Sequence, residues 1–96
     1  MTSPGAKQLV DRFALNLRRA RKRADLSQEE VAMRASVHRT EISSLERALR
    51  VACIDTLVKL AGALEVPPGC LLDGIAWERA EYARGEFRPA PRETDG

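Results

Sequence analysis

The sequence predicts a small all-α domain of five helices with a short C-terminal extension. The chain has 96 residues and a mass of 10.6 kDa, which fits a single domain. Apolar residues recur at spacings of three and four along most of its length, the pattern of helices that bury one face. Because 44% of the residues are hydrophobic and 31% are charged, we expect one modest helical core.

The first helix is predicted over residues 7 to about 24 and carries a strongly basic end. Its inward stripe consists of Val10, Phe13, Ala14, Leu17, Ala20 and Ala24. The basic residues of its last turns are Arg18, Arg19, Arg21, Lys22 and Arg23. Cations at this place stabilise the negative end of the helix dipole, and they also suit a polyanion, so both interpretations stay open. Residues 1–50 have 11 basic and 6 acidic side chains, a net charge of +5, whereas residues 51–96 have 5 and 8, a net charge of −3.

Two short helices are predicted next. Ser27 and Glu30 have the spacing of a capping box, which starts the second helix at Gln28 and carries it to about residue 35. A third helix begins near Arg39. Its strongly apolar residues are Ile42 and Leu45. Most of the surface of the third helix is therefore free to contact a partner.

The fourth and fifth helices are separated by two prolines. The fourth is predicted over residues 54–64, because Pro67 and Pro68 cannot continue it. Its inward residues are Ile54, Leu57, Val58, Ala61 and Leu64. The fifth is a very short helix over residues 68–73, with Leu71 and Leu72 facing inward.

The extension after the helices has two possible structures. Residues 75–77 and 86–88 suit two strands of a hairpin, which we favour, and residues 76–84 suit a helix. Trp77, Tyr82 and Phe87 lie here, and such large apolar groups need a surface to cover them, either on their own domain or between subunits. The chain is thus divided into an N-terminal arm (1–8), a helical domain (9–74), an extension that is a candidate dimerisation element (75–88) and a disordered tail (89–96).

Several function classes are disfavoured by what the sequence lacks. No apolar run is long enough to span a membrane and the N-terminus is too polar for a signal peptide, so we expect a cytoplasmic protein. Cys53 and Cys70 lie outside any metal or redox spacing and are expected to be free thiols. His38 is the single histidine, and we expect neither a metal site nor a cofactor. No residues are arranged for acid–base or nucleophilic work, so the chain is expected to act by binding and not as an enzyme.

Two short helices joined by a tight turn and held by a longer first helix form the organisation of a helix-turn-helix. The informative segments are residues 26–32 (LSQEEVA), 36–47 (SVHRTEISSLER) and 54–61 (IDTLVKLA). Taken together, they resemble the Cro and phage-repressor family of helix-turn-helix proteins, often called XRE-type, over about residues 9–74. The resemblance implies a lambda-repressor-like fold whose third helix enters the major groove of double-stranded DNA.

The resemblance also implies roles for individual residues. The residues that match base-reading positions are Arg39, Thr40 and Ser44. Arg39 is the strongest reader among them, because a guanidinium can bind O6 and N7 of guanine together. Phosphate or flanking contacts are expected from Gln28, Ser27, Ser43, Arg47, Arg19 and Lys22, and Gln28 is also expected to support the third helix. Arg21 and Glu46 resemble a buried ion pair that ties the third helix to the first.

Four residues raise questions of geometry. Glu41 could accept a hydrogen bond from cytosine N4 or form a capping box with His38, and we favour the cap. Ser36 and Ala48 stand where the family usually has glycine, and Cys53 stands where it usually has a Ser or Thr cap. A left-handed Ala48 would cost roughly 1 kcal/mol, unless the third helix runs on for a residue or two.

These observations lead to two hypotheses of different class. The first is a sequence-specific DNA-binding transcription regulator, a repressor in its simplest form, that binds a two-fold related operator as a homodimer. The dimer surface is expected from Leu71, Leu72, Trp77, Tyr82 and Phe87. The second is a protein-interaction module, such as an antitoxin or a restriction-modification controller partner. The sequence gives no sign of a pocket for a small-molecule effector.

Overall fold

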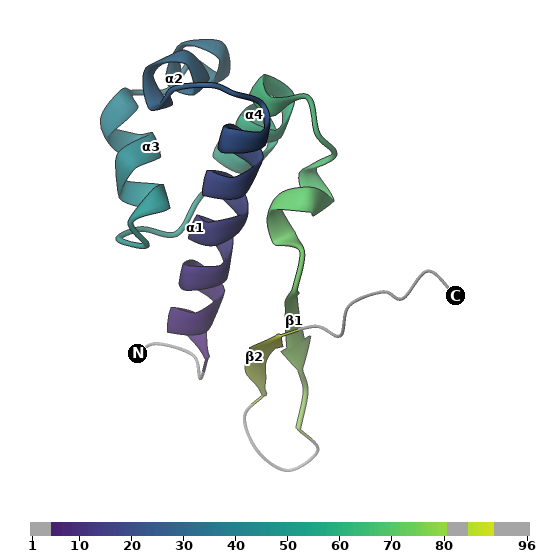
Figure 1. Ribbon diagram of the computed structural model, residues 1–96. Coiled ribbons are helices and arrows are strands. Elements are labelled where there is room, and N and C mark those ends of the chain that lie inside the picture. Colours follow the sequence, from purple (N-terminus) through teal and green to yellow (C-terminus); the bar gives the residue numbers. More distant parts are fainter. Residues whose placement is uncertain (1–4, 81–84, 90–96) are drawn as a thin grey trace.

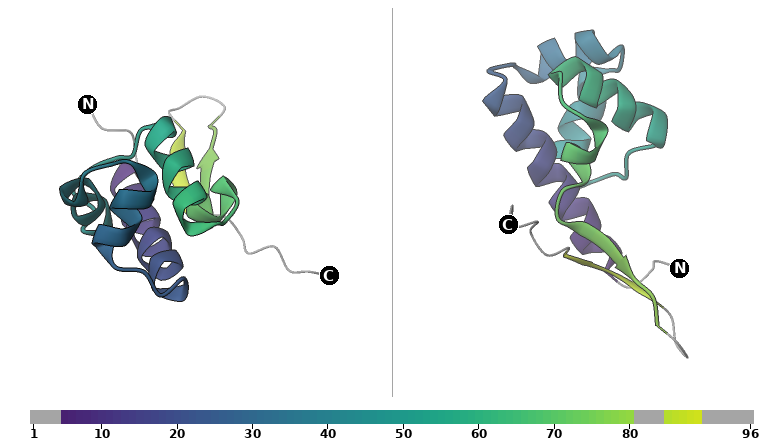
Figure 2. Two further views of the ribbon diagram at one scale, coloured as in Figure 1. Left: turned by 90° about the horizontal axis from the view of Figure 1, so that it is seen from above. Right: turned by 90° about the vertical axis from the view of Figure 1, so that its right-hand side faces the viewer.

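The computed structural model describes residues 5–80 and 85–89. The elements in chain order are α1 (Ala6–Arg23), α2 (Gln28–Ala35), α3 (Arg39–Glu46), α4 (Ile54–Leu64), the 3-10 helix η1 (Pro68–Leu72), β1 (Ile75–Glu78) and β2 (Glu86–Pro89). α1 runs through the middle of the molecule, with α3 on one side and η1 on the other (Figure 1). The hairpin lies beside the N-terminal part of α1, at the end away from α2 (Figures 1 and 2). Since α1 begins at Ala6, residues 6–8 of the expected arm are helical.

The core lies where the four α-helices and η1 meet. Its largest fully buried side chains are Leu17, Val31, Ile42, Leu45, Leu60 and Leu71. They come from all five helical segments, so each segment is anchored by at least one apolar group. The helical spacing predicted for α1 and α3 explains the burial of Leu17, Ile42 and Leu45.

The prediction for residues 68–73 is wrong, because this segment is a 3-10 helix and not a fifth α-helix. Pro67 and Pro68 remove two backbone donors, and the amide of Cys70 donates to the carbonyl of Pro67 at 2.9 Å, three residues back. Successive residues of this tight helix point in different directions. Leu71 is fully buried whereas Leu72 is 44% exposed, so the prediction that both face inward holds only for Leu71.

The prediction that all apolar residues of α4 face inward is wrong for two of them. Ile54 is 83% exposed and Val58 is 53% exposed, although both were expected to face inward. The apolar stripe of α4 is wider than the surface that the other helices cover, so Leu57 and Leu60 fill the core and the flank is left in solvent.

The hairpin predicted for the extension is confirmed. β1 and β2 are antiparallel, with Trp77 opposite Phe87 and their rings edge to face at 5.1 Å. Gly85 lies under the Trp77 ring, where a Cβ atom would have no room. Backbone contact between Gly5 and Phe87 joins β2 to the start of α1.

All four α-helices are followed by a left-handed residue that is not glycine. These residues are Asp25, Ser36, Ala48 and Glu65, with φ between 56° and 59°. After α3, the amide of Ala48 donates to Leu45 and the amide of Leu49 donates to Ser44, at 3.2 and 2.9 Å. This is the hydrogen-bond pattern of a Schellman motif, so α3 stops at Glu46 and does not run on.

A buried ion pair fixes the end of α3 against α1. Arg21 Nε lies 2.6 Å from Glu46 Oε2, and Arg21 Nη2 lies 2.9 Å from Oε1. The Glu46 side chain is only 3% exposed, and its hydrogen bond raises the pKa of Arg21 above the ordinary value in spite of burial. Arg18 donates to the Glu46 carbonyl at 3.1 Å, and Gln28 Nε2 donates to Oε1 at 3.2 Å. These bonds join α1, α2 and α3 at one residue.

Removal of the Glu46 carboxylate should strongly destabilise the fold. Glu46→Ala leaves Arg21 without its partner in a mostly buried position, so we expect the free energy of unfolding to fall by about 3–5 kcal/mol. Asp11→Ala is the matched control, because it breaks an exposed pair with Lys7 and should change stability by less than about 1 kcal/mol. Urea unfolding of both variants tests this, and equal losses would contradict a structural role for the ion pair.

Relief of the left-handed strain should stabilise the loop after α3. Ala48→Gly removes the Cβ clash at φ 59°, so the free energy of unfolding should rise by about 0.5–1 kcal/mol. Ala24→Gly is the control, because Ala24 is exposed with φ −79° and gains nothing from glycine. Thermal unfolding compares them, and a destabilised Ala48→Gly protein would show that the strain is absent in solution.

Candidate nucleic-acid interface

The turn between α2 and α3 sets the angle of a helix-turn-helix unit. Ser36 adopts the left-handed conformation with φ 57°, and the amide of Val37 donates to the Ala32 carbonyl at 3.0 Å. Val37 packs against the core, so the turn is fixed by an apolar contact as well as by its hydrogen bonds. Ser36 therefore reproduces the geometry of the usual glycine.

α3 is buried on one side and polar on the other. Ile42 and Leu45 are almost completely buried. The opposite side carries Arg39, Thr40 and Arg47, which are exposed, and Ser43 and Ser44, which are half-buried. Positions 39, 40, 43, 44 and 47 lie on one face of a helix, so the structure brings together five predicted contact residues.

The chemistry of this α3 face suits the edges of base pairs. Arg39 presents a planar fork of donors at the first turn of α3, and the serine hydroxyls can donate or accept. The Glu46 carboxylate does not oppose this face electrostatically, because it is buried and bound by Arg21. The α3 face can thus approach a polyanion through neutral and cationic groups.

The predicted capping box between His38 and Glu41 is absent. The ring Nδ1 of His38 accepts from the amide of Thr40 at 3.4 Å and lies 2.9 Å from the Thr40 hydroxyl. The imidazole therefore reaches the second residue of α3, and Glu41 makes no side-chain hydrogen bond within the described residues. The Thr40 hydroxyl is held beside His38, which leaves its methyl group and an acceptor free.

Ser27 and Gln28 lie at the start of α2. The Ser27 hydroxyl accepts from the amide of Glu30, and the Glu30 carboxylate accepts from the amide of Ser27, both at 3.0 Å. The hydrogen bond from the Ser27 amide to the carboxylate lowers the pKa of Glu30. The capping box predicted for α2 is thus present. The Gln28 side chain contacts the Glu46 carboxylate at the end of α3, as expected of a residue that supports this helix.

The basic side chains at the end of α1 point in different directions. Arg18 and Arg21 face Glu46, and Lys22 is exposed in the last turn. Arg19 lines cavities between α1, η1 and the hairpin, to which no residue of α3 contributes. The structure therefore does not bring Arg19 to the α3 face.

The residues expected at a dimer surface differ in their exposure to solvent. Leu71 is fully buried within one chain and cannot contact a partner, so its inclusion was wrong. Leu72 and Trp77 are 44% and 52% exposed, and Phe87 is half-buried against Trp77. Tyr82 lies outside the described residues.

Sequence reasoning missed a set of exposed apolar side chains in the segments that follow α3. They are Leu49, Val51, Ile54 and Val58, each more than half exposed, together with Leu72. Val51 and Leu72 line one cavity of about 190 Å³, which joins the loop after α3 to the end of η1. We call these five residues the α4 patch. The sequence did contain a signal for these exposed residues, because the apolar stripe of α4 is wider than one buried helix face needs.

Other kinds of site find no support in the part of the chain that the structure describes. No group of three His, Cys, Asp or Glu side chains in residues 5–80 and 85–89 could hold a metal ion. Cys53 and Cys70 are exposed free thiols. Among the helices described, none combines the length and the apolar character that crossing a membrane requires.

Comparisons with known proteins agree with this geometry. Control protein C.BamHI from Bacillus amyloliquefaciens is 41% identical over 51 residues, 53% of this chain and 63% of the relative. The structure of controller protein C.AhdI from Aeromonas hydrophila has a TM-score of 0.63 at 32% identity, covering 65% of this chain and 94% of that chain. C.Esp1396I, solved as a tetramer with its natural 35 base-pair operator, has a TM-score of 0.62 at 27% identity, covering 66% and 83%.

A family model described as helix-turn-helix, HTH_3, matches residues 17–69. This range begins within α1, includes α2, the left-handed turn, α3 and α4, and ends within η1. The model spans more than half of the chain, and the match falls on the elements that build the α3 face. The chain therefore belongs to the HTH_3 family of helix-turn-helix proteins.

Proposed function

We propose that this protein is a sequence-specific regulator of transcription that inserts α3 into the major groove of double-stranded DNA. The observation that carries the proposal is the α3 face, whose exposed polar residues stand opposite Ile42 and Leu45. The hydrogen bonds of Glu46 to α1 and α2 hold α3 in place in the absence of DNA. A preformed polar helix beside a tight turn is the arrangement by which helix-turn-helix proteins read base edges.

Base reading and phosphate binding are assigned to different residues. Arg39, Thr40 and Ser44 are the base readers, and Arg39 discriminates most because its fork fits guanine. Ser43, Arg47 and Gln28 contact phosphates or flanking positions, with Ser27 and Lys22 as peripheral contacts. C.Esp1396I, which is similar over 66% of this chain, was solved with its operator, and this supports DNA binding by the fold.

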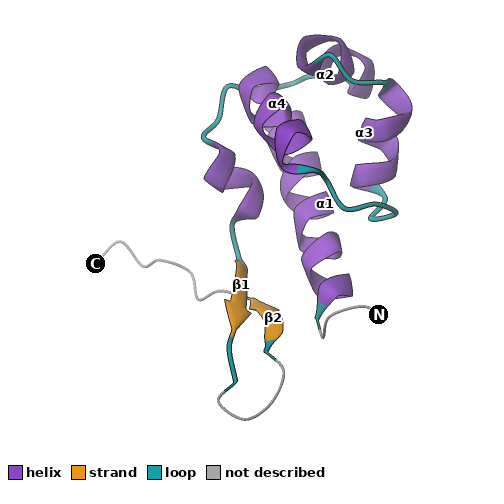
Figure 3. Ribbon diagram, turned by 180° about the vertical axis from the view of Figure 1, so that it is seen from behind, coloured by secondary structure: helices purple, strands orange, loops and turns teal. Residues whose placement is uncertain are grey.

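The regulator works as a homodimer through the α4 patch. The loop after α3 carries Leu49 and Val51 and leads to Ile54 at the start of α4, so this part of the patch follows the end of α3 directly (Figure 3). A two-fold axis at this point places one α3 on each side of it, as binding of two half-sites about 34 Å apart requires. Ile75 of β1 lines the same cavity as Val51 and Leu72, so the hairpin borders the α4 patch, and Trp77 and Phe87 stay candidates for the same contact.

A narrower function is favoured by the comparisons, namely control of restriction-modification genes. C.BamHI is a control protein at 41% identity, and C.AhdI is a restriction-modification controller protein at 32% identity. Occlusion of a promoter by the bound dimer is the simplest way for such a protein to act. Selection of bound duplexes from a random library tests the proposal: a two-fold related motif supports it, and binding indifferent to sequence contradicts it.

Readers and phosphate contacts should respond differently to substitution. Arg39→Ala removes a base contact, so affinity should fall by about 1–3 kcal/mol at one base position and specificity should relax there. Arg47→Ala should weaken all sequences alike and lower the salt slope by about one. Titrations of the selected operator and its single-base variants at two salt concentrations measure both. Identical behaviour of the two variants would contradict the assignment.

A charge within the α4 patch should prevent dimer formation. Ile54→Glu places a carboxylate in the proposed apolar interface, so the protein should sediment as a monomer and bind the full operator with a shallower concentration dependence. Met33→Glu is the matched control, because Met33 is 76% exposed on α2, away from the patch. Sedimentation equilibrium without DNA compares them, and a dimeric Ile54→Glu protein would place the interface elsewhere.

A further inference from the structure

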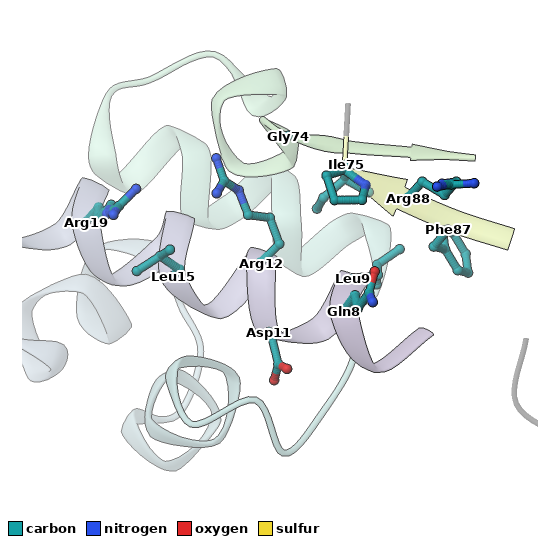
Figure 4. Close-up of a pocket in the computed structure, with 11 residues that line it drawn as sticks. Gln8, Leu9, Asp11, Arg12, Leu15, Arg19, Gly74, Ile75, Phe87 and Arg88 are labelled. Carbon is teal, nitrogen blue, oxygen red and sulfur yellow. The ribbon is translucent and has the colours of Figure 1, made fainter. Parts of the chain in front are cut away.

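A groove between α1 and the hairpin combines an apolar floor with guanidinium groups. The cavity measures about 660 Å³ and is lined by residues of α1, by Gly74 and by residues of the two strands (Figure 4). Its apolar residues are Leu9, Leu15, Ile75, Phe87 and Pro89. Its cationic residues are Arg12, Arg19 and Arg88. The size is within the range of sites for small organic ligands, about 300–1,000 Å³.

The walls of the groove are held by contacts between distant parts of the chain. Arg12 Nε donates to the Asp73 carbonyl at 3.1 Å, and Asn16 Nδ2 donates to the same carbonyl at 2.8 Å. Gly74 has φ +81°, and a Cβ there would stand 2.7 Å from Arg12 Nε, so the guanidinium packs on bare backbone. The groove is thus shaped by the fold and does not need a ligand to form it.

Most charges around the groove are already compensated. Arg88 lies 3.1 Å from Glu78 and 3.5 Å from Glu86, and the other lining acid, Asp11, lies 3.0 Å from Lys7. Arg12 is bound to the Asp73 carbonyl, as described above. Arg19 is different, because no described residue forms a hydrogen bond or ion pair with it.

Arg19 also lies where the groove continues along α1. A second cavity of about 440 Å³ shares Arg12 and Arg19 with the first and runs beside η1 past Arg23. The uncompensated guanidinium therefore stands at one end of the apolar floor, with open space on both sides. A ligand that fits must place an anionic group at Arg19 and an apolar body over Leu15, Ile75 and Phe87.

We infer that this groove binds a small amphipathic organic acid, with its carboxylate on Arg19 and its apolar chain between α1 and the hairpin. An exposed arginine fork can hold a carboxylate through two parallel hydrogen bonds. The apolar chain supplies the rest of the affinity by covering the half-buried Phe87 and Ile75. The site is separate from the α3 face, so its occupation does not depend on the proposed DNA binding.

The test uses decanoate as the probe, with acetate and 1-decanol as matched controls for the charge and for the chain alone. Nitrogen-15 NMR titration of the full chain without DNA should show amide shifts for decanoate around Leu15, Ile75 and Phe87. We expect acetate and decanol to bind at least about tenfold more weakly than decanoate, because acetate lacks the apolar chain and decanol lacks the carboxylate. Arg19→Gln should weaken decanoate by about tenfold, and Arg19→Lys should retain part of the affinity.

Arg34→Gln is the control for net charge, because Arg34 is exposed on α2 and lines neither part of the groove. It should leave decanoate affinity unchanged. Decanoate shifts that map to Ile54 and Val58 would overturn the inference, since the α4 patch would then be the apolar site. Equal affinity of decanol and decanoate, or no effect of Arg19→Gln, would overturn it as well.

Discussion

The ion pair between Arg21 and Glu46 is the constraint on which the rest of the structure depends. A carboxylate that is 3% exposed is tolerable only when its oxygens are bound, and Arg21 binds both of them. Glu46 is the last residue of α3, so the pair positions the helix that carries the polar face. Arg18 and Gln28 add bonds at the same residue, which orients α3 against α1 and α2 together.

Helix ends provide the second constraint, because they set where α3 starts and stops. Ser36 and Ala48 both take the left-handed conformation that glycine usually fills, and the reverse hydrogen bonds of the Schellman pattern compensate for the strain. The chain therefore keeps the turn geometry although it has Ser36 and Ala48 in place of the usual glycines. Backbone hydrogen bonding and the anchoring of Val37 in the core determine the turn more strongly than residue type.

The basic residues of α1 point in different directions. Adjacent residues of a helix differ by about 100°, so the basic cluster cannot act as one patch. Arg18 and Arg21 donate hydrogen bonds to Glu46, whereas Arg19 faces the groove beside η1 and the hairpin. The positive charge of the first half of the chain is thus partly structural. The groove has no lining residue from α3, but it shares Leu9 and Ile75 with the cavity that Val51 and Leu72 line, so it borders the α4 patch.

The sequence by itself determined the four α-helices and the capping box at Ser27, because these follow from local spacing and hydrogen bonding. The hairpin was favoured on the same grounds. The residues of the α3 face followed from the resemblance to the Cro and phage-repressor family. Tertiary structure alone decided which apolar residues stay outside: Leu71 is buried, whereas Ile54 remains exposed. It also decided that Arg19 faces a groove. Spacing identifies the face of a helix on which a residue lies, but only the packing of distant segments shows what covers that face.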